Sequence, residues 1–252
     1  MNDVFAQHNI DHLSPSTINT FIANPAKCLL KLAGYYSHAG PAAWRGIGAD
    51  RAISAVIANP NMNLDSAKYI AETEYNDCHK YQPDSKPDHV KKQEKYMMNC
   101  VEIAYNDLVP EYRQKNLVDI QGKITVQLED ISVPFLGYYD LLFDDCVVDL
   151  KTKSYTLKVA SLADQRQVSL YAYATKTDGA LAYISGKAAN IIPVPEVEKH
   201  VREIRQAALA LEKILSFSDD IKECCQILYP DFDHWSWSDA DKENAKQIWR
   251  MN

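Results

Sequence analysis

The spacing of apolar residues divides this chain into three parts, residues 1–116, 117–194 and 195–252. In the first part apolar residues recur every three or four positions, which predicts helices over about 14–22, 26–35, 42–59, 64–79 and 86–109. From Leu117 the period becomes two, which predicts strands, and a helical period returns over about 196–217. We therefore expect one α/β domain over 1–252, with a mixed central β-sheet and mainly helical N-terminal and C-terminal parts.

The strand region contains the signature of a tight hairpin. Residues 123–128 alternate, and residues 131–143 predict one long returning strand, with Pro134 at an edge or a bulge. Asp144 and Asp145 separate two apolar runs, as the turn of a hairpin does. This turn pairs Phe143 with Cys146 and sets Asp140 opposite Asp149. Strands over 180–184 and 189–194 follow a helix over 160–177, and the first of them is expected to run parallel to the Asp149 strand.

Two facing carboxylates on an apolar hairpin predict a cation between them. Cross-strand Cβ atoms lie roughly 5 Å apart, and like charges at that distance repel. Lys151 lies two residues after Asp149, so its ammonium is expected on the same face. Two acids and a lysine suit phosphodiester cleavage assisted by Mg²⁺ or Mn²⁺, with the lysine offsetting charge on the phosphate. The alternative is a solvated acidic hairpin.

Asp140, followed by Asp149–Leu150–Lys151 at the end of the next strand, resembles the catalytic core of the PD-(D/E)XK nuclease superfamily. Gln167–Val168–Ser169–Leu170–Tyr171 resembles the Gln-x-x-x-Tyr motif of its RecB-like, phage-type exonuclease branch. Leu13–Ser14–Pro15–Ser16 also resembles the start of those nucleases. The resemblance implies a restriction-endonuclease-like core with helical additions at both ends.

The resemblance also implies residue roles. Asp140, Asp149 and the Leu150 carbonyl would be metal ligands, and Lys151 would stabilise the transition state. Gln167 and Tyr171 would support catalysis. The expected DNA contacts are Ser14, Lys153, Arg166 and Tyr171.

Asp50 stands where these relatives have a metal-binding histidine, four residues after a glycine. A carboxylate there would make a third acidic ligand, and an all-oxygen site favours Mg²⁺. The alternative is a surface acid paired with Arg45 or Arg51.

Charge and cysteine content qualify this prediction. The net charge of −7 argues against a nucleic-acid partner, because DNA affinity depends on neutralising phosphates. Lys151, Lys153, Lys158 and Arg166 nevertheless surround the expected site. The six cysteines include no C-x-x-C pair, and Asn24 precedes Pro25 where cluster-bearing relatives have cysteine. We therefore expect reduced thiols and no iron–sulfur cluster.

Three functions remain to be separated. The first is a metal-dependent exonuclease acting on linear DNA ends in recombination, repair or phage DNA metabolism. The second is an endonuclease on the same core, and the third is an inactive DNA-binding or assembly subunit. A homo-oligomer or a single-strand-annealing recombination partner stays open. With no secretory signal and no apolar run of about 18 residues, we expect no membrane association and a cytoplasmic location, the host cytoplasm for a phage protein.

The C-terminal tail carries several aromatic residues. We expect Trp235 and Trp237 to pin it to the body of the protein.

Overall fold

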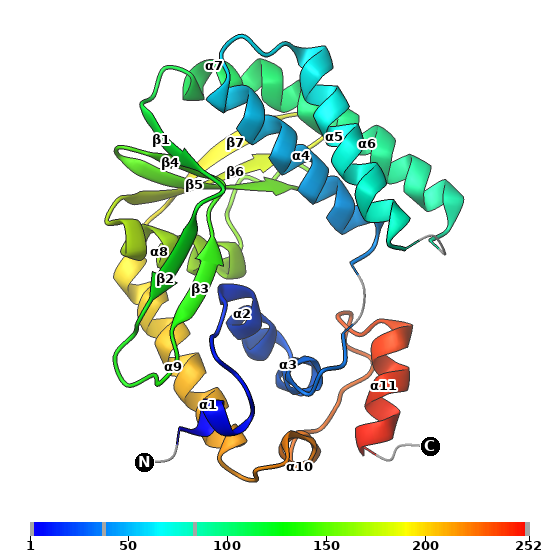
Figure 1. The fold of residues 1–252 in the computed structure, drawn as a ribbon, viewed down its shortest axis with the longest axis vertical. Helices are drawn as coiled ribbons and strands as arrows, with labels where there is room; N and C mark the ends of the chain where they lie inside the picture. Colours follow the sequence, from blue (N-terminus) through cyan, green and yellow to red (C-terminus); the bar gives the residue numbers. More distant parts are fainter. Residues whose placement is uncertain (1–2, 37–38, 83–84, 250–252) are drawn as a thin grey trace. The chain divides into compact units, whose positions relative to one another are not determined.

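The computed structural model describes residues 3–36, 39–82 and 85–249, which form two compact units (Figure 1). The sheet unit comprises His38–Lys123 and Tyr138–Val197. The helical unit comprises Met1–Ser37, Ile124–Gly137 and Glu198–Asn252. Both units are therefore assembled from segments that are distant in the sequence.

The sheet unit is built on a five-stranded mixed sheet with the order β1-β4-β5-β6-β7. Its strands are β1 (Leu117–Ile120), β4 (Leu141–Phe143), β5 (Cys146–Thr152), β6 (Asp178–Ile184) and β7 (Ala189–Val194). β5 and β6 run parallel, as expected, and the other neighbours are antiparallel. The predicted fold class, a mixed sheet flanked by helices, is confirmed.

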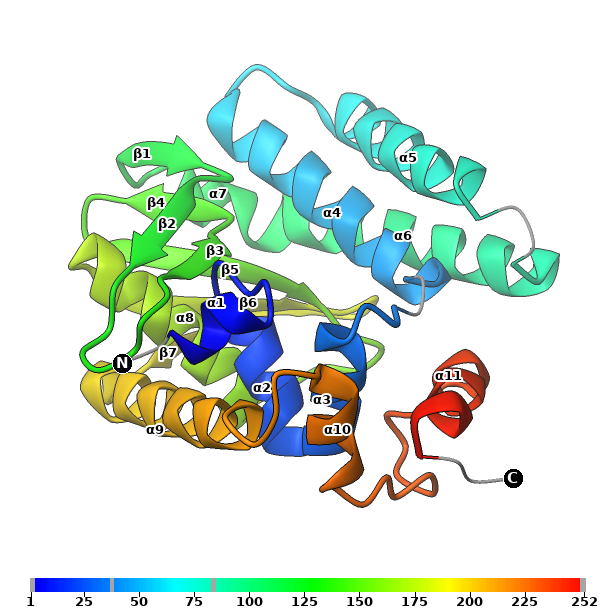
Figure 2. The ribbon, with the colours of Figure 1, turned by 60° about the horizontal axis from the view of Figure 1, so that its bottom comes forward.

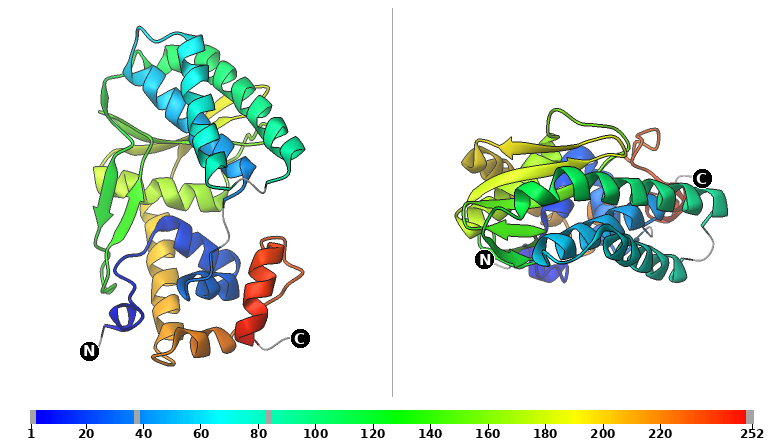
Figure 3. Two further views of the ribbon diagram at one scale, coloured as in Figure 1. Left: turned by 45° about the vertical axis from the view of Figure 1, so that its right-hand side comes forward. Right: turned by 90° about the horizontal axis from the view of Figure 1, so that it is seen from above.

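Helices cover both faces of this sheet (Figure 3). Helices α4 (Pro41–Ala58), α5 (Leu64–Lys80), α6 (Pro87–Asp107) and α7 (Val109–Tyr112) share one core with Val148, Leu150 and Ala182. α8 (Leu162–Thr175) forms the crossover from β5 to β6 and packs through Val168 on Leu181 and Tyr183. Because side chains alternate along a strand, these two sets lie on opposite faces.

The β4–β5 hairpin has the register that the sequence predicts. Leu141 pairs with Val148 and Leu142 with Val147, so Asp144–Asp145 form the turn. Asp140 lies one residue before β4, and Asp149 lies one residue beyond the last pair of this ladder.

The single long strand predicted over residues 131–143 is wrong. β3 (Phe135–Tyr138) pairs with β2 (Lys123–Val126) in a separate two-stranded sheet, whereas β4 belongs to the five-stranded sheet. The chain changes sheets at Tyr139 and Asp140. The Tyr139 hydroxyl donates to Asp119 (2.7 Å), and the Asp140 carboxylate accepts the Leu150 N–H (2.7 Å), so both side chains are held at the break. Pro134 lies before β3.

The helical unit contains α1 (Val4–Gln7), α2 (Pro15–Ala23), α3 (Pro25–Leu32), α9 (Val197–Leu215), α10 (Ile221–Gln226) and α11 (Asp239–Trp249) (Figure 2). Ser14 and Asn24 cap α2 and α3, and a proline occupies the first turn of each, as the sequence predicts. Over the described ranges, the protein contains no helix with the length and apolar character that crossing a membrane requires.

The C-terminal tail is anchored inside the helical unit by one tryptophan. Trp237 is buried between Phe232 and Trp249, which confirms the expectation for this residue. Trp235 is 86% exposed, so the expectation for Trp235 is wrong. A buried ion pair between Lys27 and Asp241 (2.8 Å) is a second anchor of the tail.

Two glycines of α4 provide a matched test of how closely the helices pack. A Cβ at Gly48 would lie 2.8 Å from the Ala71 carbonyl oxygen and 2.5 Å from Met97 Sδ, whereas at Gly46 the nearest atom is 3.7 Å away. We predict that Gly48→Ala lowers the free energy of unfolding by about 2 kcal/mol through overpacking. Gly46→Ala should raise it by up to about 1 kcal/mol, because alanine favours helix. Urea titration checks both, and equal effects would contradict this packing.

Candidate active site

The candidate site lies where β4 stops and β5 continues. The β4–β5 ladder ends at the pair Leu141–Val148, so residues 149–152 have their ladder partners on β6. The Leu150 N–H on the other side donates to Asp140 Oδ2 at 2.7 Å. In a strand the N–H and C=O of one residue point to the same side, so the Leu150 carbonyl also faces the Asp140 side.

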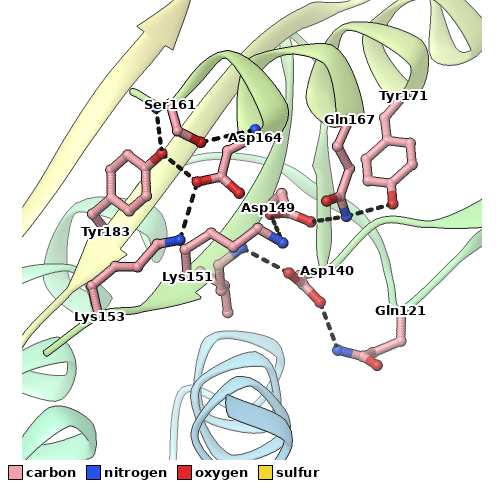
Figure 4. A network of polar contacts seen from close by, with 11 residues as sticks. Gln121, Asp140, Asp149, Lys151, Lys153, Ser161, Asp164, Gln167, Tyr171 and Tyr183 are labelled. Carbon is pink, nitrogen blue, oxygen red and sulfur yellow. Dashed lines mark hydrogen bonds and ion pairs between the residues drawn. The ribbon is translucent and has the colours of Figure 1, made fainter. Parts of the chain in front are cut away.

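Asp149 and Lys151 form the centre of the site (Figure 4). Lys151 Nζ lies 2.6 Å from Asp149 Oδ2. Asp149 is 2% exposed, while the Lys151 side chain is 22% exposed and reaches solvent. The strand period therefore places the carboxylate and the ammonium on one face, as expected.

Helix α8 brings the Gln-x-x-x-Tyr pair to the same carboxylate (Figure 4). Gln167 Nε2 donates to Asp149 Oδ1 (3.1 Å) and to the Tyr171 hydroxyl (2.8 Å). Tyr171 is 3% exposed. Because its ring is buried and its oxygen accepts from Gln167, Tyr171 fixes the Gln167 amide, which in turn fixes one oxygen of Asp149.

Gln121 is a site residue that the sequence analysis missed. It lies in the turn between β1 and β2 with a left-handed φ of 54°. Its Nε2 donates to Asp140 Oδ1 (3.2 Å), and its backbone N–H donates to the Asp140 carbonyl (2.9 Å). Each of the two facing carboxylates is thus held by one glutamine amide. A residue in a turn has no periodic sequence pattern. The left-handed φ of Gln121 is visible only in the structure, so nothing in the sequence marked this residue.

Asp50 on α4 belongs to the same group of charges. Its Oδ1 is shielded from solvent and has no hydrogen-bond partner. Arg51 pairs with Glu74 (3.5 Å), and Arg45 donates to Gln93 (2.7 Å), so neither arginine is the ion-pair partner of Asp50. The alternative of a surface acid paired with one of them is therefore not supported.

Burial and neighbouring carboxylates raise the pKa of all three carboxyl groups. Burial and the Asp149 carboxylate raise the pKa of Asp140 to about 7. Burial also raises the pKa of Asp149, against the opposing effect of Lys151. Burial and Asp140 raise the pKa of Asp50 well above its ordinary value. Burial lowers the pKa of Lys151, but the nearby carboxylates, Asp149 foremost, raise it by more. The ammonium therefore stays charged at neutral pH.

This donor set fits a divalent cation. Three ionised carboxylates and one ammonium carry a formal charge of −2, and one of these oxygens lacks any partner. Among the described residues, no three His, Cys, Asp or Glu side chains are close enough as they stand to hold a metal ion together. Oxygen ligands of this kind are those that Mg²⁺ and Mn²⁺ accept.

Of the residues expected to contact DNA, Lys153 and Arg166 lie in the sheet unit and Ser14 lies in the helical unit. Lys153 lies two residues beyond Lys151 and pairs with Asp164 (3.2 Å), which also accepts from the Tyr183 hydroxyl (2.7 Å). Arg166 is half-buried on α8, next to Gln167. Ser14 belongs to the helical unit, where its hydroxyl caps α2 by accepting the Thr17 N–H.

The six cysteines occur as free thiols in both units. Burial raises the pKa of Cys28 and of Cys225 to about 12 and that of Cys100 and Cys146 to about 11. These thiols are therefore protonated and act as small apolar side chains.

Comparison with known proteins gives one family. A family model described as the PD-(D/E)XK nuclease superfamily matches residues 12–236. No curated protein matches the sequence. Among solved structures, one described as "Crystal structure of SSO0001" is 12% identical, with a TM-score of 0.34, over 57% of this chain and 70% of its own.

The raised pKa of Asp140 predicts a stability test in the absence of metal. The folded protein holds a proton on Asp140 up to about pH 7, whereas the unfolded chain loses it near pH 4. Stability therefore falls as pH rises from 4 to 7. Asp140→Asn removes this loss, so we predict a gain of about 1–2 kcal/mol at pH 8 that shrinks towards pH 5.

Urea titration of the metal-free protein at both pH values measures this difference. Asp178→Asn is the matched control, since Asp178 is exposed at the start of β6. A loss of stability in Asp140→Asn at pH 8 would contradict the proposed repulsion.

Proposed function

This chain belongs to the PD-(D/E)XK nuclease superfamily, and we propose that it is a metal-dependent deoxyribonuclease that hydrolyses phosphodiester bonds at DNA ends. The observation that supports the proposal most strongly is the meeting of Asp140, Asp149 and Lys151 at the open edge of β5. Two acids from neighbouring strands and one ammonium form the donor set that metal-assisted phosphodiester hydrolysis needs.

We assign the ligands of the ion to Asp140, Asp149, the Leu150 carbonyl and Asp50. A bound Mg²⁺ or Mn²⁺ ion would supply Lewis-acid chemistry and lower the pKa of a bound water. Asp50 Oδ1 has no partner in the protein, which supports its assignment as the third acidic ligand.

The remaining residues act through charge and orientation. Lys151 is partly exposed and stays protonated, so it can offset negative charge on the phosphate. Gln121 and Gln167 hold Asp140 and Asp149 in position through their amides. Lys153 and Arg166, on the α8 side of the site, are proposed to contact the DNA backbone.

Action at DNA ends rests on the Gln167–Tyr171 pair. In the resemblance, this motif belongs to the end-processing RecB-like branch, and here the pair is hydrogen-bonded to the proposed ligand Asp149. The proposal therefore places the protein in recombination, repair or phage DNA metabolism rather than in site-specific cutting.

Substitutions in the site should separate ligands from the residues that orient them. We predict that Asp149→Ala abolishes cleavage of linear duplex DNA at saturating Mg²⁺, and that Lys151→Ala lowers kcat about 10²–10³-fold. Gln121→Ala and Gln167→Ala should cost about 10–100-fold, because they only orient a ligand.

Asp178→Asn is the control and should retain full activity, since its exposed carboxylate lies at the start of β6. Release of labelled nucleotides measures all variants. Retained cleavage by Asp149→Ala would end the proposal.

The form of the DNA tests whether ends are required. We predict that linear duplexes are degraded while covalently closed circles of the same sequence stay intact. Linearising the circle with one cut should restore degradation. Duplexes labelled at the 5′ or the 3′ end then give the polarity, and cutting of the closed circle would favour the endonuclease alternative.

A further inference from the structure

A pocket of about 290 Å³ lies in the sheet unit, beside the carboxyl ends of the parallel strands β5 and β6. Its lining includes Tyr96 and Asn99 from α6, Tyr155 and Thr156 from the loop after β5, and Ser185 and Lys187 from the turn after β6. We call it the strand-end pocket. In open α/β sheets, ligands bind at the carboxyl ends of parallel strands. The strand-end pocket lies at the corresponding ends of β5 and β6.

Hydrogen bonds hold the pocket open. The Tyr96 hydroxyl donates to the Lys153 carbonyl (3.0 Å) and accepts the Gly186 N–H (2.9 Å). The Thr156 and Ser185 hydroxyls lie 2.9 Å apart. A Cβ at Gly186 would be 3.0 Å from the Tyr96 ring, so glycine allows this close approach. Both loops and α6 are tied together, and the pocket does not need to be formed on binding.

The charge around the pocket favours an anion. Its lining contains no carboxylate, although the whole chain carries a net charge of −7. Lys187 is exposed and has no ion pair within the described part of the chain. Behind Tyr96, the Arg45 guanidinium lies 5.2 Å from the ring centre.

Among the residues that the structure describes, Arg45 has neutral hydrogen-bond partners only: it donates to Gln93 (2.7 Å) and to the Thr152 carbonyl (3.5 Å). It is 7% exposed, its Nε has no hydrogen-bond partner, and the described residues offer it no ion pair. A buried guanidinium without a carboxylate is costly unless an anion balances it. Its charge adds to that of Lys187 at this end of the sheet.

The pocket also offers surfaces for a base and a sugar. Tyr155 is 67% exposed at the rim, and exposed aromatic rings stack on bases. The Asn99 amide and the Thr156 hydroxyl are exposed and supply both donors and acceptors.

Ser154, at the edge of the pocket, lies three residues after Lys151, in a bend beyond the end of β5. Three residues of chain span at most roughly 10 Å, so Ser154 lies within that distance of the Lys151 backbone. That separation suits a nucleotide next to the one whose phosphate is cleaved.

We propose that the strand-end pocket binds one nucleotide of the substrate DNA strand, with its phosphate towards Lys187 and its base on Tyr155. The inference rests on the proposed nuclease function and adds to it a subsite outside the metal ligands. It makes Tyr155 and Lys187 determinants of DNA binding rather than of chemistry.

Kinetics on linear duplex DNA test the subsite. Tyr155→Ala and Lys187→Ala should each raise KM about 5- to 50-fold while kcat changes less than twofold, since neither side chain touches the carboxylates. Tyr69→Ala is the matched control, because Tyr69 is 71% exposed on α5. Thermal melting confirms that each variant is folded. A KM for Tyr155→Ala equal to that of the wild type would overturn the subsite.

Substrates with one abasic nucleotide locate the base. At one position relative to the cleaved bond, the abasic substrate should have a higher KM than the intact substrate for the wild type. For Tyr155→Ala, the two substrates should have the same KM. Equal added effects in both proteins at every position would overturn the stacking assignment.

Photo-crosslinking separates this inference from the proposed function, because it needs no cleavage. A strand carrying 5-iodouracil at that position should crosslink to Tyr155 in the wild-type protein. Crosslinking without cleavage would support the subsite while the nuclease proposal fails. Cleavage without crosslinking at any position would overturn the subsite alone. Free deoxynucleoside monophosphate can be added as a competitor of the crosslink to Tyr155. If it competes as well as the unlabelled strand does, the pocket binds a product nucleotide, and binding of the strand is overturned.

Discussion

The structure of the site depends on the repulsion between two carboxylates that the hairpin register forces together. Asp149, which is buried, and Asp140, which is half-buried, both lie at the end of the β4–β5 ladder. The Lys151 ammonium forms an ion pair with Asp149. A third carboxyl group, that of Asp50, is close enough for Asp140 and Asp149 to raise its pKa. Without a further cation, the protein relieves this repulsion by holding protons, which is why burial and Asp149 raise the pKa of Asp140 to about 7.

The fold accommodates this arrangement by ending one strand early. β4 is three residues long, and the chain enters it from a different sheet, so part of β5 keeps an edge that is not covered by β4. Through that edge the Leu150 N–H reaches Asp140, while α8 reaches Asp149 from one face of the sheet. The two glutamines, on a turn and on a helix, hold one carboxylate each. The rigidity of the site thus comes from amides that carry no charge of their own.

The sequence predicted the parts of this site that depend on local period and register. The two-residue turn Asp144–Asp145 fixes the hairpin, so the pairing of Leu141 with Val148 followed from counting residues, and Asp140 and Asp149 are the residues just beyond that pair. Gln167 and Tyr171 are four apart on one helix, and their role in the site was implied by the resemblance to the Gln-x-x-x-Tyr motif. The family match over residues 12–236 agrees with the resemblance on which the residue roles were based.

The remaining features depend on contacts that no local pattern encodes. The break at Tyr139–Asp140 follows from bonds to Asp119 and Leu150, which are distant in the sequence, so the apolar alternation suggested one long strand. Gln121 lies in a turn and is placed by its backbone conformation. Trp235 and Trp237 are equally apolar, yet only the packing partners Phe232 and Trp249 decide which of them is buried.

The most direct measurement is calorimetric titration of the metal-free protein with Mn²⁺ in two buffers of different ionisation enthalpy at pH 7. The account predicts binding with release of protons, because a carboxyl group whose pKa is about 7 must lose its proton to become a ligand. Asp149→Ala should lose this binding, while Asp178→Asn should keep it. Absence of binding by the wild-type protein, or undiminished binding by Asp149→Ala, would contradict the account.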